Sequence, residues 1–255
     1  MPPDKTTEPN KPERKPKKSK PAFFSIENLR SLAIWIVIIF AIRWSVASPY
    51  HVPTPSMEPT IKVGDRLLAY KLSYEFKLPF TDIALFGWDK PTHGDIIVFR
   101  YPNDPNIDYV KRVVAIGGDD VELRNGYLYI NANKRELHDH NFDRSILADI
   151  YDNKDDKLLY REGSEQAGYW VMYNKTTQFA TRNWPWRGTF KVPQDSVVVI
   201  GDNRDNSSDS REWREVPLSY VRGKALFVLW SMFTPQGDPW YRMQFRLNRF
   251  GYTLR

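Results

Sequence analysis

Ser56 is the residue of this sequence whose surroundings most favour covalent chemistry. It lies in the segment 53–60, PTPSMEPT, shortly after an apolar stretch. A serine hydroxyl is a poor nucleophile until a base removes its proton, so a hydrolase interpretation requires such a base elsewhere in the chain. None of the histidines is placed like the base of a conventional serine protease, so another residue type has to supply it.

Lys111, in the segment 109–114, YVKRVV, is the candidate base. A lysine accepts a proton only when it is neutral, and its ordinary pKa of about 10.4 makes the neutral form rare in water. Burial disfavours the ammonium form and lowers this pKa. Residues 110–116 are predicted to form a strand in which the Lys111 side chain projects among apolar neighbours. The alternative is an exposed strand lysine beside Arg112.

The segment 201–211, GDNRDNSSDSR, directly follows a predicted strand at 196–200. A calcium loop is excluded, because an acidic 1, 3, 5 pattern that starts at Asp202 meets Arg204, and no glycine or closing glutamate follows at the required places. The remaining interpretation is a turn held by aspartate–arginine pairs. Such a turn also places a serine hydroxyl at a fixed point, where it can orient a neutral amine.

Composition limits the architecture. The chain has 255 residues, of which 41% are apolar, and this suffices for one large core or for a core and a smaller lobe. The absence of cysteine excludes disulfides, zinc-thiolate sites and thiol catalysis, and it leaves the redox compartment open.

Residues 1–22 are predicted to be a disordered basic tail. They carry seven lysine and arginine side chains against three acidic ones, a local charge of +4 within a net charge of +6. The segment is rich in proline and lacks aromatic residues, so it has little apolar surface to bury. A solvated tail is therefore favoured over specific nucleic-acid binding.

Residues 29–47 are predicted to be a single transmembrane anchor. They contain an uninterrupted apolar run of eleven residues from Leu32 to Ile42. A helix needs about 20 residues to cross a bilayer, so spanning requires Arg30 and Arg43 to snorkel from the two ends. With the basic tail inside, everything after Tyr50 then lies across the membrane.

Two alternatives to the anchor are a buried core helix and a cleaved export signal. The core helix is disfavoured because the run is apolar on every face. The segment 45–47, SVA, has the small-x-small spacing of a cleavage site, but Pro49 and the long charged leader fit a cleaved signal poorly.

After residue 50 the sequence predicts a mostly β fold, with an antiparallel β catalytic domain formed by residues 50–130 and 191–255. Short β-branched or aromatic runs indicate its strands. These runs lie at 95–99, 110–116, 121–124, 127–130, 196–200 and 225–232. Asn125-Gly126 favours a hairpin turn, because both central positions of a type I′ turn need positive φ. Residues 131–190, polar at first and then aromatic, are predicted to be an inserted β-ribbon lobe.

Residues 74–88 carry several aromatic and aliphatic side chains without a clear period. Such a loop either rests among lipid headgroups, where amphipathic rings are stable, or packs onto the sheet. The sequence leaves both possibilities open, and it leaves the same question open for Trp230 and Trp240.

At these motifs the chain resembles the type I signal peptidases, the membrane-anchored serine proteases that remove signal peptides from exported proteins. The matching segments, in order, are 53–60 with Gly64-Asp65, then 93–99, then 108–113 with 117–119, then 201–211. The segment 246–251, RLNRFG, is similar to the Gram-negative branch of the family. The resemblance extends over most of residues 29–131 and 191–255.

The resemblance implies a Ser/Lys catalytic dyad. Ser56 would attack the scissile carbonyl to form an ester acyl-enzyme, and Lys111 would take the serine proton and later activate water. Ser207 would hydrogen-bond the lysine, while the backbone N–H of Ser56 and the hydroxyl of Thr54 would bind the oxyanion. The implied structural ion pairs behind the site are Asp202 with Arg204 and Asp209 with Arg211.

The resemblance also implies the substrate and the location. Shallow apolar pockets would accept small side chains at positions −1 and −3 of an extended signal peptide. The implied lining residues are Val52, Met57, Tyr109 and Val110. The implied partners are preproteins and the lipid bilayer, with no cofactor, metal or nucleic acid. The protein would be a single-pass protein of the bacterial inner membrane, with a cytoplasmic N-terminus and a periplasmic catalytic domain.

Two other functions stay open on the sequence. One is a dedicated maturation or self-cleaving Ser/Lys peptidase with a single client, and the other is a non-catalytic membrane-tethered binding protein. The presence of Ser56, Lys111 and Ser207 argues against the binding protein. The lack of a DNA-binding segment argues against a repressor-type self-cleaving protein.

Overall fold

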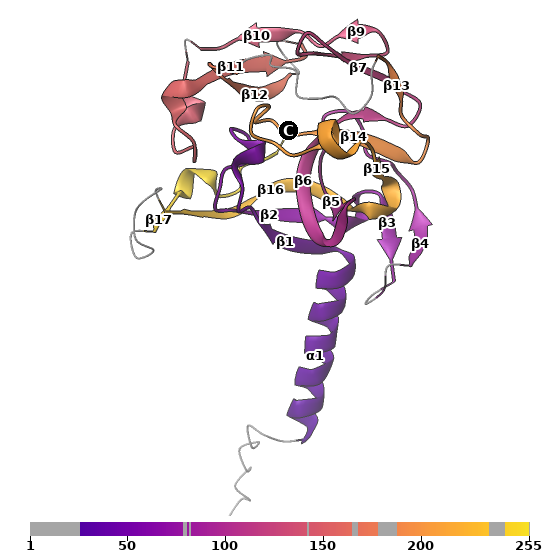
Figure 1. Ribbon diagram of the computed structural model, residues 1–255. Helices are drawn as coiled ribbons and strands as arrows, with labels where there is room; N and C mark the ends of the chain where they lie inside the picture. Colours follow the sequence, from indigo (N-terminus) through magenta and orange to yellow (C-terminus); the bar gives the residue numbers. More distant parts are fainter. Residues whose placement is uncertain are drawn as a thin grey trace, which may run out of the picture. The chain divides into compact units, whose positions relative to one another are not determined.

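The computed structural model describes residues 26–78, 81, 83–141, 143–164, 168–177, 188–234 and 243–254. Helix α1 and most of the strands are labelled in Figure 1. The predicted basic tail at 1–22 lies outside the described residues, as does Trp240. The chain separates into two compact units, residues 1–40 and residues 41–255.

Helix α1 (Ile26–Ser45) coincides with most of the predicted anchor segment. Glu27 lies in its first turn and Arg43 in its last turn, the placement that complements the helix dipole. Its large apolar side chains are exposed, which contradicts the alternative of a buried core helix. These side chains are Leu29, Leu32, Ile34, Trp35, Ile36, Val37, Ile38, Ile39 and Phe40. Within the described part of the chain, no helix is both long enough and apolar enough to span a bilayer.

The unit 41–255 is built around an eight-stranded sheet in which the paired strands are antiparallel. The strand order is β1, β2, β16, β5, β6, β14 and β15, and β17 pairs with β16. The bounds are β1 (Ala47–His51), β2 (Asp65–Tyr70), β5 (Ile96–Tyr101), β6 (Asp104–Ile116), β14 (Ser196–Ile200), β15 (Val216–Pro217), β16 (Val221–Phe233) and β17 (Gln244–Phe245). The prediction of a mostly β, antiparallel fold is confirmed.

Each predicted strand is present, and the two that differ most from their predicted bounds are longer. The strand predicted at 110–116 is the second half of β6, which begins at Asp104. Residues 104–109 lack a β-branched pattern, but Asp104, Asp108 and Tyr109 pair with β5, and the register shifts between Arg100 and Tyr101. β16 likewise begins at Val221, four residues before the predicted start. Pairing with a neighbouring strand thus extends both elements beyond their apolar runs.

The predicted hairpin at Asn125-Gly126 joins β7 (Asp120–Arg124) to β8 (Tyr127–Ile130). Asn125 has a φ of 52° and Gly126 a φ of 78°. Both central residues therefore adopt the positive φ that the turn type requires.

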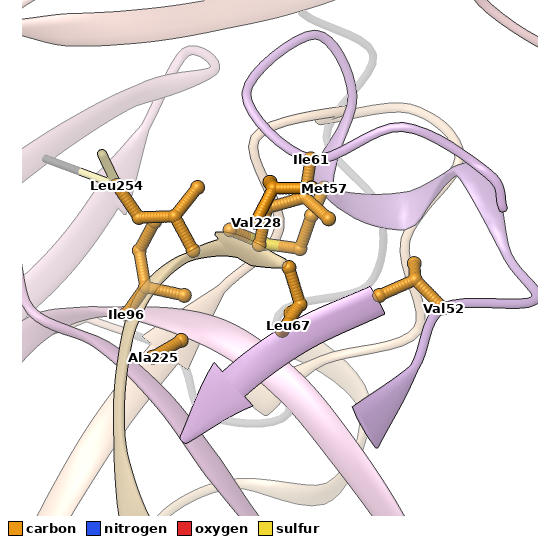
Figure 2. Packing of buried hydrophobic residues seen from close by; sticks show 8 residues of the cluster. All are labelled: Val52, Met57, Ile61, Leu67, Ile96, Ala225, Val228 and Leu254. Atoms are coloured by element: carbon orange, nitrogen blue, oxygen red, sulfur yellow. The ribbon is translucent and has the colours of Figure 1, made fainter. Parts of the chain in front are cut away.

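Alternating side chains of the sheet enter different parts of the core. In β14, Val197 and Val199 pack into one cluster, while Val198 and Ile200 pack into another, so this strand is buried on both faces. A further cluster joins β2 and β16 to the loop that carries Ser56 (Figure 2). Its members are Val52, Met57, Ile61, Leu67, Ile96, Ala225, Val228 and Leu254. The loop after β1 is thereby attached to the main core by its own apolar side chains.

The residues predicted as an inserted lobe form short strands in two smaller sheets. These strands are β9 (Asn133–Lys134), β10 (Leu137–Asp139), β11 (Lys157–Glu162), β12 (Tyr169–Asn174) and, at 190–191, β13 (Phe190–Lys191). Strands β10, β11 and β12 make one sheet, and β13, β7, β8 and β9 make the other. Leu147, Ile150, Leu159 and Met172 form a separate core cluster here. Part of the predicted aromatic stretch, residues 178–187, lies outside the described residues.

The aromatic segment 74–88 forms a hairpin of β3 (Glu75–Lys77) and β4 (Ala84–Gly87). Its larger apolar side chains are exposed, and they are Leu78, Ile83, Leu85, Phe86 and Trp88. These side chains therefore do not pack onto the sheet, whereas Tyr74 of the same segment is buried in a core cluster with Ile97 and Phe99. Trp230, on β16, is also exposed.

Candidate active site

Ser56 lies in a single turn of 3₁₀ helix, η1 (Pro55–Met57), and is almost completely buried. Pro55 begins the turn with a fixed φ, and the turn is closed by a 3.0 Å hydrogen bond from Glu58 N to Pro55 O. The base of the loop is closed where Val52 N donates to Asp65 O and Gly64 N donates to Val52 O. The nucleophile loop, residues 52–65, therefore has a defined conformation at both ends.

Lys111 extends from β6 directly to Ser56, although the two residues are 55 positions apart in sequence. Lys111 Nζ donates to Ser56 Oγ at 2.7 Å and to Val110 O at 3.0 Å. Only 3% of Lys111 is exposed. The alternative of an exposed strand lysine is therefore wrong.

The surroundings of Lys111 favour the neutral amine. Burial lowers the pKa of Lys111 to about 8, against the opposing influence of Asp209 and Asp202. At that pKa about a tenth of the molecules carry a neutral Lys111 at pH 7, which is far more than for a lysine in water. The arrangement thus meets the first requirement for lysine to act as a base near neutral pH.

The loop 201–211 packs directly against the nucleophile loop. Asn203 N donates to Ser56 O, and Asn203 Nδ2 donates to Pro55 O, both at 3.1 Å. A Cβ atom on Gly201 would lie 2.5 Å from Ser56 O and closer still to Ser207 Oγ, so no other residue fits at this close approach. Asn203 and Gly201 were not identified as site residues from the sequence, although both lie inside the recognised motif.

Ser207 is oriented by its neighbour Asp209. Its hydroxyl donates to Asp209 Oδ2 at 2.7 Å, which leaves the oxygen lone pairs to face other donors. The contact expected from Ser207 to Lys111 stays a prediction. Thr54 Oγ1 lies 3.4 Å from Ser56 Oγ, so the second predicted oxyanion donor is adjacent to the nucleophile.

One of the two predicted ion pairs is present, and the other is wrong. Arg211 binds both oxygens of Asp209 at 2.8 Å, as predicted. Asp202 does not pair with Arg204, because it accepts two hydrogen bonds from Arg112 of β6, at 2.8 and 2.7 Å. Arg204 instead binds Glu162 of the lobe, with one contact at 2.8 Å.

The physical reason is the strand-like contact that this loop makes with β12. Met172 N donates to Asp202 O and Arg204 N donates to Met172 O, both at 2.9 Å. This bridge brings Arg204 to the lobe, whereas Asp202 faces the neighbouring strand of the main sheet. Both partners come from elsewhere in the sequence, so a pattern within the loop could not reveal them.

The C-terminal segment also contacts the nucleophile loop. Arg249 Nε donates to Asp65 Oδ1 at 3.0 Å, and its Nη2 donates to Thr60 O at 2.9 Å. The ion pair joins residues 184 positions apart. The motif at 246–251 is therefore part of the support for the site.

A cleft of about 390 Å³ opens beside the dyad. Val52, Tyr109 and Val110 line it, together with Ser56 and Lys111, and their role in substrate binding stays a prediction. The prediction for Met57 is wrong, because this side chain is fully buried and packs into the core beside Ile61 (Figure 2). Ser56 and Met57 are adjacent in η1, and their side chains point to different sides of the loop.

Other cleft residues were not identified from the sequence. They are Tyr50, His51, Ile107, Asp108 and Asn206, among others. Their types carry no local signal of a binding role, because the cleft forms only when β1 and β6 come together. In the described part of the chain, no cluster of three or more histidine, aspartate or glutamate side chains could hold a metal ion.

A family model described as signal peptidase, peptidase S26, matches residues 25–230. The chain belongs to this family. It is 32% identical to signal peptidase I of Buchnera aphidicola subsp. Acyrthosiphon pisum, over 94% of this chain and 85% of that protein. It is 33% identical to signal peptidase I of Pseudomonas fluorescens, over 76% and 68% of the two chains.

Among solved structures, a crystal structure of a signal peptidase I from Enterococcus faecalis is 24% identical and covers 53% of this chain and 97% of that one, with a TM-score of 0.33. The matches to the family and to the bacterial relatives identify the chain as a serine endopeptidase of the S26 type.

Removing either member of the dyad of this S26 peptidase should abolish activity. We expect Ser56→Ala and Lys111→Met each to lower kcat/KM for a preprotein by at least about 1,000-fold, because each removes a reacting atom. Circular dichroism and thermal unfolding should show that both variants fold. Lys90→Met, which changes an exposed lysine paired with Asp195 outside the cleft, is the matched control. Near wild-type turnover by either dyad variant would disprove the assignment.

The pH dependence should follow the amine of Lys111. Because burial lowers its pKa to about 8 and only the neutral amine accepts a proton, kcat/KM should rise with pH and level off above about 8. Initial rates of preprotein cleavage between about pH 6 and pH 10 measure this profile. A rate independent of pH over that range is the result that excludes a lysine base.

A methyl group at position 201 should impair catalysis without altering a reacting atom. Gly201→Ala is expected to lower kcat by about 10- to 100-fold, because its Cβ would displace the Ser56 carbonyl or Ser207. Gly87→Ala is the control, since its Cβ would meet no atom closer than 3.9 Å. Equal activity of the two alanine variants would show that the contact at Gly201 is not critical.

Proposed function

We propose that this protein is a membrane-anchored signal peptidase that cleaves exported preproteins with Ser56 as nucleophile and Lys111 as general base. The observation that carries the proposal is the 2.7 Å hydrogen bond between Lys111 Nζ and Ser56 Oγ in a buried site. Burial supplies the lowered pKa that a lysine base requires. The cleft beside the pair supplies a place for the substrate.

The reaction proceeds in two stages. Lys111 takes the proton of Ser56 as Oγ attacks the scissile carbonyl carbon, and the C–N bond then breaks as Lys111 returns that proton to the leaving amine. The signal peptide remains as an ester of Ser56. Lys111 next takes a proton from water, whose oxygen attacks the ester, and the proton finally returns to Ser56 Oγ. No cofactor is consumed.

The oxyanion of each tetrahedral intermediate needs donors close to Ser56. The backbone N–H of Ser56 and the Thr54 hydroxyl are the proposed donors, and one such donor typically contributes about 3 kcal/mol. The 3.4 Å separation of Thr54 Oγ1 and Ser56 Oγ supports this role. Ser207, whose proton is directed to Asp209, is suited to accept a hydrogen bond from the Lys111 amine.

The cleft favours substrates with small side chains. Tyr109 stacks on Tyr101 with ring centroids 4.6 Å apart, and Trp213 packs edge-on against it at 5.6 Å. This packing holds the Tyr109 ring in place, so the wall of the cleft cannot easily move aside for a large side chain. We therefore propose that Val52, Tyr109 and Val110 restrict positions −1 and −3 of the substrate to small residues. The substrate would lie extended between β1 and β6, which flank the cleft. Its backbone would form hydrogen bonds with these strands.

Membrane attachment is proposed for the N-terminal region. The apolar side chains of α1 and the basic residues 1–22 favour a single anchor with a cytoplasmic N-terminus, in which Arg30 and Arg43 snorkel from the helix ends. The exposed aromatic residues of the hairpin β3–β4 are suited to the headgroup region. The catalytic domain, residues 50–130 and 191–255, and the lobe, residues 131–190, would then face the periplasm of a bacterium.

The test is direct sequencing of the reaction product. Detergent-solubilised full-length protein is incubated with several unrelated preproteins, and the new amino terminus of each product is determined. We expect one cut per preprotein, after a small residue at −1 and with a small residue at −3. The Ser56→Ala variant should give no product.

Three results would contradict the proposal. They are no cleavage of any preprotein, cleavage that persists in Ser56→Ala, and cleavage at sites without small residues. Processing of a single preprotein from the panel would instead identify a dedicated maturation peptidase.

A further inference from the structure

Glu58, two residues after the nucleophile, is a fully buried side chain that takes no part in the proposed reaction. Both of its carboxylate oxygens accept from the backbone N–H of Tyr151, at 2.9 and 3.1 Å, and Oε1 lies 3.4 Å from Val63 N. Its own N–H closes the η1 turn on Pro55 O. Ser56 and Glu58 thus share one turn, and the far end of that turn is bound to the lobe.

The lobe segment that Glu58 contacts, residues 148–152, is held at several further points. The donors come from the nucleophile loop, the C-terminal segment and the loop 201–211. These contacts run from Lys62 to Ala148 O, from Arg246 to Asp149 O and from Asn206 to Asp152. Glu58, at the C-cap of η1, makes a direct contact from the turn to this segment, and Asn203 Nδ2 bridges Pro55 O and Asp152 Oδ2 at 3.1 and 3.4 Å. The contact of Glu58 links the segment to the turn through a bond that the turn makes itself, whereas the other link passes through Asn203 of a separate loop.

We propose that Glu58 is a positioning residue whose carboxylate ties the η1 turn to residues 148–152 and so holds Ser56 Oγ within hydrogen-bond distance of Lys111. The inference rests on the proposed function, because it assigns a role within that reaction. Glu58 acts through Ser56 and does not touch the substrate cleft, whose lining does not include it.

Ionisation of Glu58 matters for this role. A carboxylate presents only acceptors, and its charge strengthens the bonds that it receives from N–H groups. A protonated carboxyl group has one hydroxyl, which is a donor facing other donors. Protonation would therefore weaken the contact with Tyr151 N and release the turn.

The pKa of Glu58 lies near neutrality. Burial raises it to about 7, while the N–H groups of Tyr151 and Val63 oppose this rise. Asp152 of the lobe raises the pKa further, and Lys62 of the nucleophile loop lowers it. Arg246 of the C-terminal segment also faces this carboxylate. Activity should accordingly fall as pH drops through about 7, in addition to the loss caused by protonation of Lys111.

The kinetic test compares full-length wild type with Glu58→Gln in detergent, with kcat for a preprotein measured between about pH 5.5 and pH 9.5. In the wild type, the slope of log kcat should exceed about 1 around pH 7, since protonation of Glu58 adds a loss of up to about tenfold to the loss caused by protonation of Lys111. Glutamine stays neutral, so the slope should fall to about 1 and kcat at about pH 9 should be roughly tenfold lower. KM should change little.

Three variants serve as controls. Glu136→Gln alters an exposed lobe glutamate, and Tyr151→Phe keeps the backbone N–H, so both should retain the wild-type profile. Glu58→Asp keeps a titratable carboxylate and should restore the steeper slope. Loss of thermal stability in Glu58→Gln with an unchanged slope would reduce Glu58 to a structural residue and overturn the proposal.

A second measurement needs no variant and no substrate. Hydrogen exchange of the Tyr151 amide, expressed as a protection factor, should drop as pH falls from about 8.5 to about 6. Constant protection over this range would overturn the inference even if preproteins are cleaved normally. Conversely, a pH-dependent protection factor in a protein that cleaves no preprotein would refute the proposed function and leave the coupling of Glu58 to the lobe intact.

Discussion

The 2.7 Å contact between Lys111 Nζ and Ser56 Oγ is the interaction on which the rest of this structure depends. An amine in this position serves as a base only if water is kept away from it, because hydration restores its ordinary pKa. The surrounding elements meet this condition in different ways. Strand β6 supplies Lys111 from a buried face of the sheet, η1 presents Ser56, and Gly201 lets a second loop approach the Ser56 carbonyl closely.

Behind the dyad, the loops are fixed by buried charged pairs. Arg112 with Asp202, Arg204 with Glu162 and Arg211 with Asp209 are each almost inaccessible to solvent. Pairs of this kind often contribute little to net stability, because desolvation offsets their attraction, but breaking one leaves an unpaired buried charge. Here the main effect of the ion pairs is to fix the conformation of the loops. A loop held by bidentate contacts at several points has few alternative conformations, and the nucleophile loop packs against that loop.

The proximity of Ser56 and Lys111 could be predicted from sequence, whereas the contacts that support the two residues could not. Ser56 and Lys111 were identified because the motifs that contain them, together with residues 201–211, resemble in order those of the type I signal peptidases, and the hairpin at Asn125-Gly126 follows from backbone sterics. The partner of Asp202 was missed because Arg112 lies 90 positions away. Met57 was misassigned because the direction of a side chain within a 3₁₀ turn depends on the core that receives it. Long-range pairing and packing direction are properties of the folded chain, and no local pattern encodes them.

The contact between Arg249 and the nucleophile loop has a consequence for synthesis. Asp65 and Thr60 leave the ribosome long before the arginine that binds them, since the ion pair spans 184 positions. Until that arginine emerges, the loop bearing the reactive alcohol lacks one of its anchors, and the buried aspartate has no counter-charge. This loop can therefore reach its final conformation only after the C-terminal segment has been synthesised.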